Sequence, residues 1–154
     1  MAATFQWSES NGAGETVTNG ISNVNFGNLD SPNLASPNNR VIAGNNSVEK
    51  WNRGRFSGTY TTIDNLRFYK SAGTLPANVF IKAAVNAAYT APTDGTSTVA
   101  LNNVPTTEGT ALVPTSPGAS PSFSGYIIMQ LQTTGAASPG AIATQTFTLK
   151  YDEI

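Results

Sequence analysis

The sequence predicts an all-β fold, an antiparallel β-sandwich or jelly roll with an extended N-terminal arm. Its composition is the first indication, since the 154 residues include 20 Thr, 16 Asn and 14 Ser. Thr favours strands because its branched Cβ restricts χ1, and Asn and Ser favour turns because their side chains bond the nearby backbone. The second indication is the pattern of short runs in which apolar and polar residues alternate, with Gly or Pro between the runs.

Residues 1–46 are predicted to form the extended arm, and residues 47–154 the sandwich domain. The arm consists mostly of Asn, Gly, Ser and Pro around short apolar runs at residues 4–7, 16–18 and 24–26. Asn11-Gly12 and Asn19-Gly20 are signals for type I′ turns. Two arrangements of this arm are open: it straps a neighbouring subunit, or it folds back and adds an edge strand to its own sandwich.

Strands in the second segment are predicted at residues 47–60, 66–70, 79–83, 97–101, 126–132 and 144–151. Gly54 and Gly58 interrupt the first of these runs, which indicates a bulge or a close approach of two backbones. The last two runs alternate most clearly, as is typical of half-buried antiparallel strands. Four Pro residues between positions 105 and 121 predict a long surface loop.

Charged residues make up only 11% of the chain, and their distribution is uneven. The net charge is −1 overall but +5 over residues 40–82. A chain so close to neutrality has no general attraction to nucleic acid or membranes, so neither is an expected partner. Within the basic segment, Arg40, Arg53, Arg55 and Arg67 are candidate contacts to an acidic partner surface. The alternative is that they are solvated side chains of two strands.

The chain contains no His and no Cys, which excludes Ser-His-Asp and Cys-His catalysis and the usual zinc ligand sets. The nine carboxylates are scattered, and the adjacent pair Asp152-Glu153 would point to opposite faces of a strand. We therefore expect no enzyme, no catalytic residue and no cofactor. Oxygen ligands at Asn28 and Asp30 would suit calcium, but a turn explains Asp30 more simply, and no metal site is predicted.

Phe5 and Trp7 are predicted to be partner contacts. They lie in the polar arm, which offers few apolar neighbours, and exposed aromatic side chains commonly pack on a partner surface. In the functional interpretation they insert into a neighbouring subunit, and in the alternative they fold back onto their own sandwich. The aromatic residues of the other predicted strands are expected mostly in the core.

Three segments resemble small structural proteins of tailed bacteriophages: SVEKW at residues 47–51, DNLRFYKSAGTLP at 64–76, and residues 122–153, which end in TFTLKYDE. The resemblance extends over about residues 24–154 and includes no catalytic motif. Chains of this size in such virions resemble capsid decoration, or cement, proteins.

This resemblance implies a place on the capsid exterior, contact with the major capsid protein, and a homo-oligomer, with a trimer favoured. Synthesis in the host cytoplasm is expected because the N-terminus lacks the pattern of a signal peptide. A tail, neck or head-fibre component is an alternative, and so is a carbohydrate- or receptor-binding module.

Overall fold

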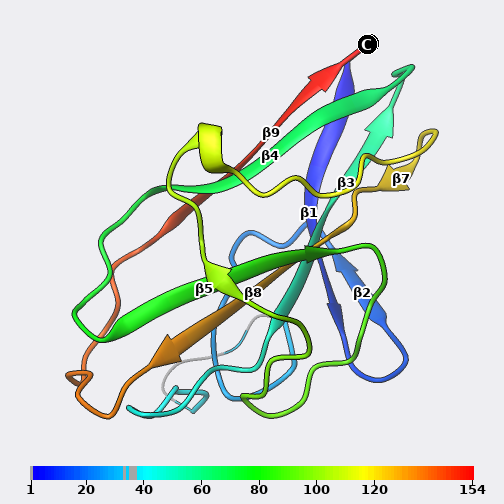
Figure 1. Ribbon diagram of the computed structural model, residues 1–154. Coiled ribbons are helices and arrows are strands. Elements are labelled where there is room, and N and C mark those ends of the chain that lie inside the picture. The colour runs from blue at the N-terminus through cyan, green and yellow to red at the C-terminus, as the bar shows by residue number, and fades with distance from the viewer. Residues whose placement is uncertain (1, 33, 35–37) are drawn as a thin grey trace.

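The computed structural model describes residues 2–32, 34 and 38–154, and its strands form two antiparallel sheets (Figure 1). The larger sheet has seven strands in the order β2-β1-β3-β8-β5-β6, with β7 also paired to β3. The smaller sheet pairs β4 with β9. Since the two sheets share an apolar core, the predicted β-sandwich is confirmed. The jelly-roll form is not confirmed, because the strands divide very unevenly between the two sheets.

The larger sheet contains β1 (Ala3–Asn11), β2 (Thr16–Asn19), β3 (Lys50–Gly58), β5 (Val79–Asn86), β6 (Asn102–Asn103), β7 (Ser122–Phe123) and β8 (Tyr126–Thr133). The smaller sheet contains β4 (Ile63–Ala72) and β9 (Thr146–Glu153), and a short 3-10 helix, η1 (Glu108–Thr110), lies in the Pro-rich loop. No helix among the described residues is long and apolar enough to cross a membrane.

Most of the predicted strands are confirmed with shifted ends, as β3, β4, β5, β8 and β9. The strand predicted at residues 97–101 is wrong: that segment consists of bends and irregular backbone, and the short β6 follows it.

The position of β1 decides between the two arrangements predicted for the N-terminal arm: the arm folds back onto its own sandwich, but its strand is not at the edge. This strand pairs with β3 over eight positions, from Ala3 opposite Gly58 to Ser10 opposite Trp51, and with β2 on its other side. It is therefore an interior strand of the larger sheet, as Figure 1 shows. The boundary predicted at residue 46 does not separate two units, because strands before and after it belong to one sheet.

The main core lies between the two sheets. Phe68 of β4 packs there against alternate side chains of β5 and β8, among them Ile81, Ile127 and Met129. Phe147 and Leu149 of β9 pack against the same cluster, as their alternation in the sequence predicts. A neighbouring cluster joins Phe56, Ile63 and Leu66 near the start of β4.

The other face of the larger sheet is also covered. Trp51, Tyr126 and Ile128 form a buried cluster there, against which three side chains of the segment between β5 and β6 pack, namely Tyr89, Val99 and Leu101. Residues 126–131 of β8 are consequently buried on both faces. The sequence predicts a half-buried strand here, and that is wrong because the covering segment is irregular backbone with no periodic pattern.

Candidate functional site

Phe5 and Trp7, the predicted anchors, lie in the aromatic core between the sheets. Their rings are 5.3 Å apart in an edge-to-face arrangement. The ring of Phe5 lies 5.4 Å from Phe56 and 6.1 Å from Tyr151, and that of Trp7 lies 6.1 Å from Phe68. Both side chains are half-buried. The prediction that they are exposed partner contacts is wrong, since their own sandwich supplies the apolar neighbours.

Arg53 is held inside its own subunit. Its Nη2 lies 3.0 Å from Glu15 Oε1, and its guanidinium stacks at 4.1 Å over the ring of Phe123 and at 4.6 Å over that of Tyr126. The hydroxyl of Tyr126 donates to the same carboxylate. Burial, and then this hydrogen bond, raise the pKa of Tyr126 to about 12. These contacts brace the β1–β2 hairpin against β3 and β8.

The other three predicted arginines lie in separate places. Arg55 donates to Gln6 across the β1–β3 ladder at 3.2 Å, and Arg67 donates to the carbonyl oxygen of Leu66 at 2.9 Å. Arg40 is exposed in the irregular segment between β2 and β3. Arg53 and Arg55 share one face of β3, but the four guanidinium groups form no common patch. Arg40 lines the larger cavity of the molecule, and Arg67 lines a smaller one beside β4 and β9.

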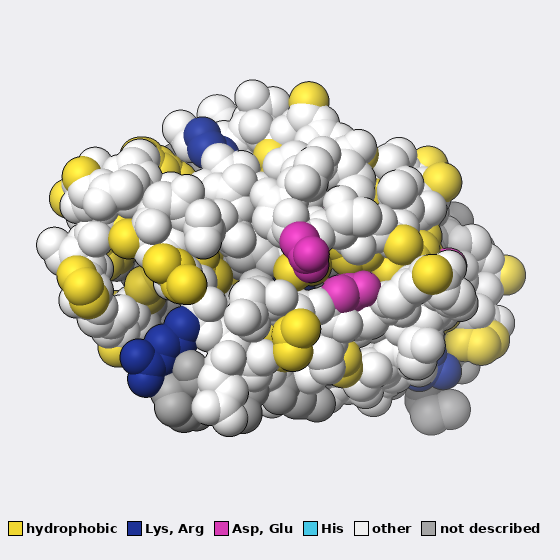
Figure 2. Space-filling view, turned by 90° about the horizontal axis from the view of Figure 1, so that it is seen from below, with side chains coloured by type: hydrophobic (Ala, Val, Ile, Leu, Met, Phe, Trp, Pro, Cys, Tyr) yellow, Lys and Arg dark blue, Asp and Glu magenta, His cyan; other side chains and the backbone are white. Residues whose placement is uncertain are grey.

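An apolar groove of about 1280 Å³ opens between the inner face of the larger sheet and the segments 21–26, 39–43 and 137–147. Its lining includes Val79 and Ile81 of β5 and Met129 and Leu131 of β8. Figure 2 shows hydrophobic side chains gathered around a hollow on one face of the molecule. Arg40 is the one charged residue in the described lining.

The groove exists because the two sheets differ in size. The two strands of the smaller sheet cover part of the inner face, and irregular segments carrying Val24, Phe26, Val41 and Ile142 pack over the rest. Ile42 is 69% exposed in the groove lining. The groove can therefore bind apolar surface with an acidic group near Arg40, and its described lining contains no carboxylate.

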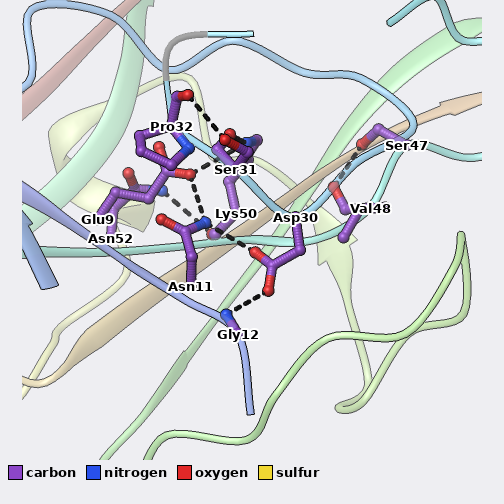
Figure 3. A network of polar contacts seen from close by, with 10 residues as sticks. All are labelled: Glu9, Asn11, Gly12, Asp30, Ser31, Pro32, Ser47, Val48, Lys50 and Asn52. Atoms are coloured by element: carbon purple, nitrogen blue, oxygen red, sulfur yellow. Dashed lines mark hydrogen bonds and ion pairs between the residues drawn. The ribbon is translucent and has the colours of Figure 1, made fainter. Parts of the chain in front are cut away.

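A buried polar network lies on the same inner face, between β1, β3 and the segment after β2 (Figure 3). Lys50 Nζ is 3.0 Å from Glu9 Oε1 and donates at 2.6 Å to the carbonyl oxygen of Ser31. Asn11 Nδ2 donates to Glu9 Oε1 at 2.9 Å and to Asp30 Oδ1 at 2.7 Å. The side chains of Lys50 and Glu9 are 0% and 1% exposed.

The sequence does not reveal this network, because its members lie far apart in the chain. The one local signal is the spacing of Glu9 and Asn11, two residues apart on β1 and so on one face of the strand. Asp30, weighed in the sequence as a calcium ligand, instead accepts hydrogen bonds from Asn11 and from the backbone of Gly12. The described residues contain no group of three or more His, Cys, Asp or Glu side chains that could hold a metal.

Glu49 holds the segment between β5 and β6 by hydrogen bonds against the outer face of the larger sheet. Its carboxylate is buried and accepts hydrogen bonds from Trp51 Nε1 at 3.1 Å, Thr98 N at 2.8 Å and Thr98 Oγ1 at 2.6 Å. With its two oxygens satisfied by protein donors, this carboxylate serves the fold and is closed to a substrate.

Comparison with known proteins identifies no relative of this chain. No family model, no curated protein and no solved structure matches it. The role of the groove is therefore inferred from its geometry and from the three sequence segments that resemble phage structural proteins.

Proposed function

We propose that this chain is a virion structural protein of the capsid decoration class, which binds the outer capsid shell and bridges neighbouring capsomers. The observation that carries the proposal is the open apolar groove, with Ile42 69% exposed in its lining. Large contiguous apolar surfaces on soluble proteins commonly mark contact sites. The three segments that resemble phage structural proteins support the same class.

The proposed occupant of the groove is an apolar segment of the major capsid protein that carries an acidic side chain. The described lining contains Arg40 as its charged residue and no carboxylate, so an acidic group is the complementary charge. Complementary charges of this kind favour the correct register between partners.

Because the capsid presents many copies of the same binding surface, each single contact with this protein can be weak. A capsid presents the same surface many times, and a homo-oligomer, with a trimer favoured, would engage several capsomers at once. Linked contacts act at high effective concentration, so the assembly binds far more tightly than one groove alone. The rigid sandwich would hold the grooves at a fixed spacing.

The experiment that tests this function is a binding assay with purified capsids that lack the protein. We expect the wild-type chain to saturate the heads and Ile42→Asp to bind at least about tenfold more weakly, because a charge would enter apolar contact area. Val113→Asp is the matched control, since Val113 is 56% exposed and does not belong to the groove lining. Both variants should unfold at the wild-type temperature.

Other outcomes of the assay would replace the proposal. Binding to tails or necks, seen by gold labelling in electron micrographs, would make the chain a tail, neck or head-fibre component. Selective binding to a glycan array without binding to heads would make it a carbohydrate- or receptor-binding module. Equal loss of binding in Ile42→Asp and Val113→Asp would remove the groove from the interface.

A further inference from the structure

The network in Figure 3 brings an amine, a carboxylate and a primary amide together inside the sandwich. Glu9 Oε1 lies 3.0 Å from Lys50 Nζ and 2.9 Å from Asn11 Nδ2. The amine and the amide therefore approach the same oxygen atom, and their nitrogens are separated by no more than the sum of these two distances.

Strand pairing aligns the amine and the amide. Ser10 lies opposite Trp51 in the β1–β3 ladder, so the next position of this antiparallel register brings Asn11 opposite Lys50. Directly opposed residues point to the same face and have Cβ atoms about 4.5–5.5 Å apart. A Lys side chain is long enough to reach the Cγ of an Asn across that gap.

Burial gives this trio a chemical environment that a surface pair lacks. Lys50 and Asn52 are 0% exposed and Glu9 is 1% exposed, and the neighbouring strand places Met129 opposite Lys50 and Ile127 opposite Asn52. Nζ of Lys50 and Oε1 of Glu9 lie 3.0 Å apart with almost no access to water, so a proton can pass directly from the amine to the carboxylate. A neutral amine is a nucleophile.

The amide of Asn11 lacks a hydrogen-bond donor for its oxygen. Asn11 Oδ1 is buried and has no hydrogen-bond partner among the residues that the structure describes. A buried acceptor without a donor is costly. A carboxyl group that has taken up the proton of Lys50 could supply the donor, and this hydrogen bond would also polarise the amide carbonyl.

We propose that Lys50 and Asn11 become joined by an intramolecular isopeptide bond, with Glu9 transferring the proton. Lys50 Nζ attacks Cγ of Asn11, a new C–N bond forms, and the C–Nδ2 bond of the amide breaks. Glu9, which already carries one proton from Nζ, delivers it to the departing nitrogen, which leaves as ammonia, and takes up the second proton that Nζ loses. Atoms and electrons balance without an oxidant, a metal or a cofactor.

The bond would be a covalent cross-link within the sandwich that requires no cysteine. It would join β1 to β3 and close the chain between residues 11 and 50. A cross-link that closes a loop constrains the unfolded chain and so favours the folded state, as a disulfide does. This inference is independent of the proposed place on a capsid.

The chain contains an internal control for the reaction. Lys82 and Asn103 are also paired across two strands, and Lys82 Nζ lies 2.6 Å from Asn103 Oδ1. This second pair is solvent-accessible, and the ion pairs of the described residues include none between Lys82 and a carboxylate. Proximity without burial and without a proton carrier should leave it unreacted.

The test is mass spectrometry of the purified full chain. We expect an intact mass lower than the sequence mass by one ammonia molecule. Trypsin should cut after Arg40 and Arg53 but not after Lys50, and should release residues 41–53 attached to the peptide that contains Asn11. It should cut normally after Lys82. An intact mass equal to that of the unmodified sequence overturns the proposal.

The same mass loss could arise in another way, because Asn11 precedes Gly12. Attack on Cγ by the backbone nitrogen of Gly12 would also release ammonia and give a succinimide. That product leaves Lys50 free for trypsin and regains mass by hydrolysis at mildly alkaline pH. Loss of ammonia without the linked peptide would therefore overturn the isopeptide bond.

Two substitutions assign the roles. Glu9→Gln keeps the shape of the side chain but removes the proton carrier, and Lys50→Arg keeps the charge but removes the nucleophile. Each should restore the full mass and abolish the linked peptide. A linked peptide that persists in Glu9→Gln would remove Glu9 from the mechanism. If these variants fail to fold, the mass and peptide map of the wild-type chain still decide whether the bond exists.

Discussion

Trp7 lies directly opposite Gly54 in the ladder between β1 and β3, and the missing side chain of Gly54 makes room for the aromatic core. A Cβ added at Gly54 would lie 2.9 Å from the ring of Phe5, 2.9 Å from that of Phe56 and 3.1 Å from Leu149. These contacts are too close to be relieved by a small shift, because rings on two strands would have to move together. Gly54 thus makes room for side chains, and the predicted close approach of backbones lies instead at Gly58, where an added Cβ would be 3.0 Å from the backbone oxygen of Ala2.

Gly54→Ala should lower the free energy of unfolding by about 1–3 kcal/mol, the usual cost of inserting a methyl group into a packed core. Urea denaturation followed by Trp fluorescence would measure the change. Gly109→Ala is the matched control, because nothing lies within 4 Å of a Cβ built at Gly109. Equal stability of the two variants would show that the aromatic cluster is more loosely packed than the distances indicate.

Trp7→Ala should lower the free energy of unfolding by about 3 kcal/mol, the lower end of the range for removing a core Trp, because the ring is half-buried. This outcome follows from its edge-to-face contacts with Phe5 and Phe68. The interpretation of Trp7 as an exposed anchor leads to the opposite expectation, an unchanged midpoint.

Phe80→Ala provides the comparison for that measurement. Phe80 is another aromatic strand residue, near the start of β5, but it is 41% exposed. Its removal should change the free energy of unfolding by only about 0.5 kcal/mol, as is usual for surface positions. If Trp7→Ala were equally mild, β1 would contribute little to the stability of the sheet.

Tyr126 should make the stability of the protein fall at high pH. Burial and the hydrogen bond to Glu15 raise its pKa from 10.0 to about 12 in the folded state. Between these two pH values the unfolded chain has lost the phenolic proton while the folded chain retains it, so the unfolded state gains stability as pH rises. This contribution of Tyr126 is intact below pH 10 and is lost as pH approaches 12.

The measurement is the free energy of unfolding across that pH range for wild type and Tyr126→Phe. The variant has no proton to lose at this position, so its curve should fall less steeply. Groups that do not interact with Tyr126 titrate equally in both proteins and cancel in the difference. Parallel curves would mean that the hydroxyl of Tyr126 is in water rather than bound to Glu15.

The outcomes for β9 and β1 show how far the sequence alone can predict this fold. In β9, Phe147, Leu149 and Tyr151 alternate with polar residues, and this local pattern identifies both the strand and its inward face. The end of β1 reads Ser-Glu-Ser-Asn, which has the composition of a loop. Its place in the sheet depends on pairing with β3, and such long-range pairing leaves no local pattern.

The sequence does not predict the polar network or the groove, for the same reason. Glu9 and Lys50 are 41 positions apart and meet only through the β1–β3 register. The groove results from the unequal size of the two sheets, which no single segment encodes. The wrong strand at residues 97–101 has a related cause, since Thr98 there bonds the carboxylate of Glu49 where a strand would bond a neighbouring backbone.

Glu49→Gln should release the segment that covers Trp51 and Ile128. The carboxylate accepts three hydrogen bonds, from Trp51 Nε1, Thr98 N and Thr98 Oγ1. The amide of Gln has one acceptor oxygen, and its NH₂ group would face a donor. A buried donor left without an acceptor costs about 1–3 kcal/mol, so we expect a loss of about 2 kcal/mol in the free energy of unfolding, with faster hydrogen exchange at the Thr98 amide.

Glu108→Gln is the matched control for this experiment. Glu108 forms an ion pair with Lys150, but both side chains are about half exposed, at 51% and 53%. Exposed pairs of this kind contribute little to stability because water and salt screen them. Glu108→Gln should therefore leave both the unfolding transition and the exchange at Thr98 unchanged. If Glu49→Gln also left Thr98 protected, packing of Tyr89, Val99 and Leu101 alone would hold the segment in place.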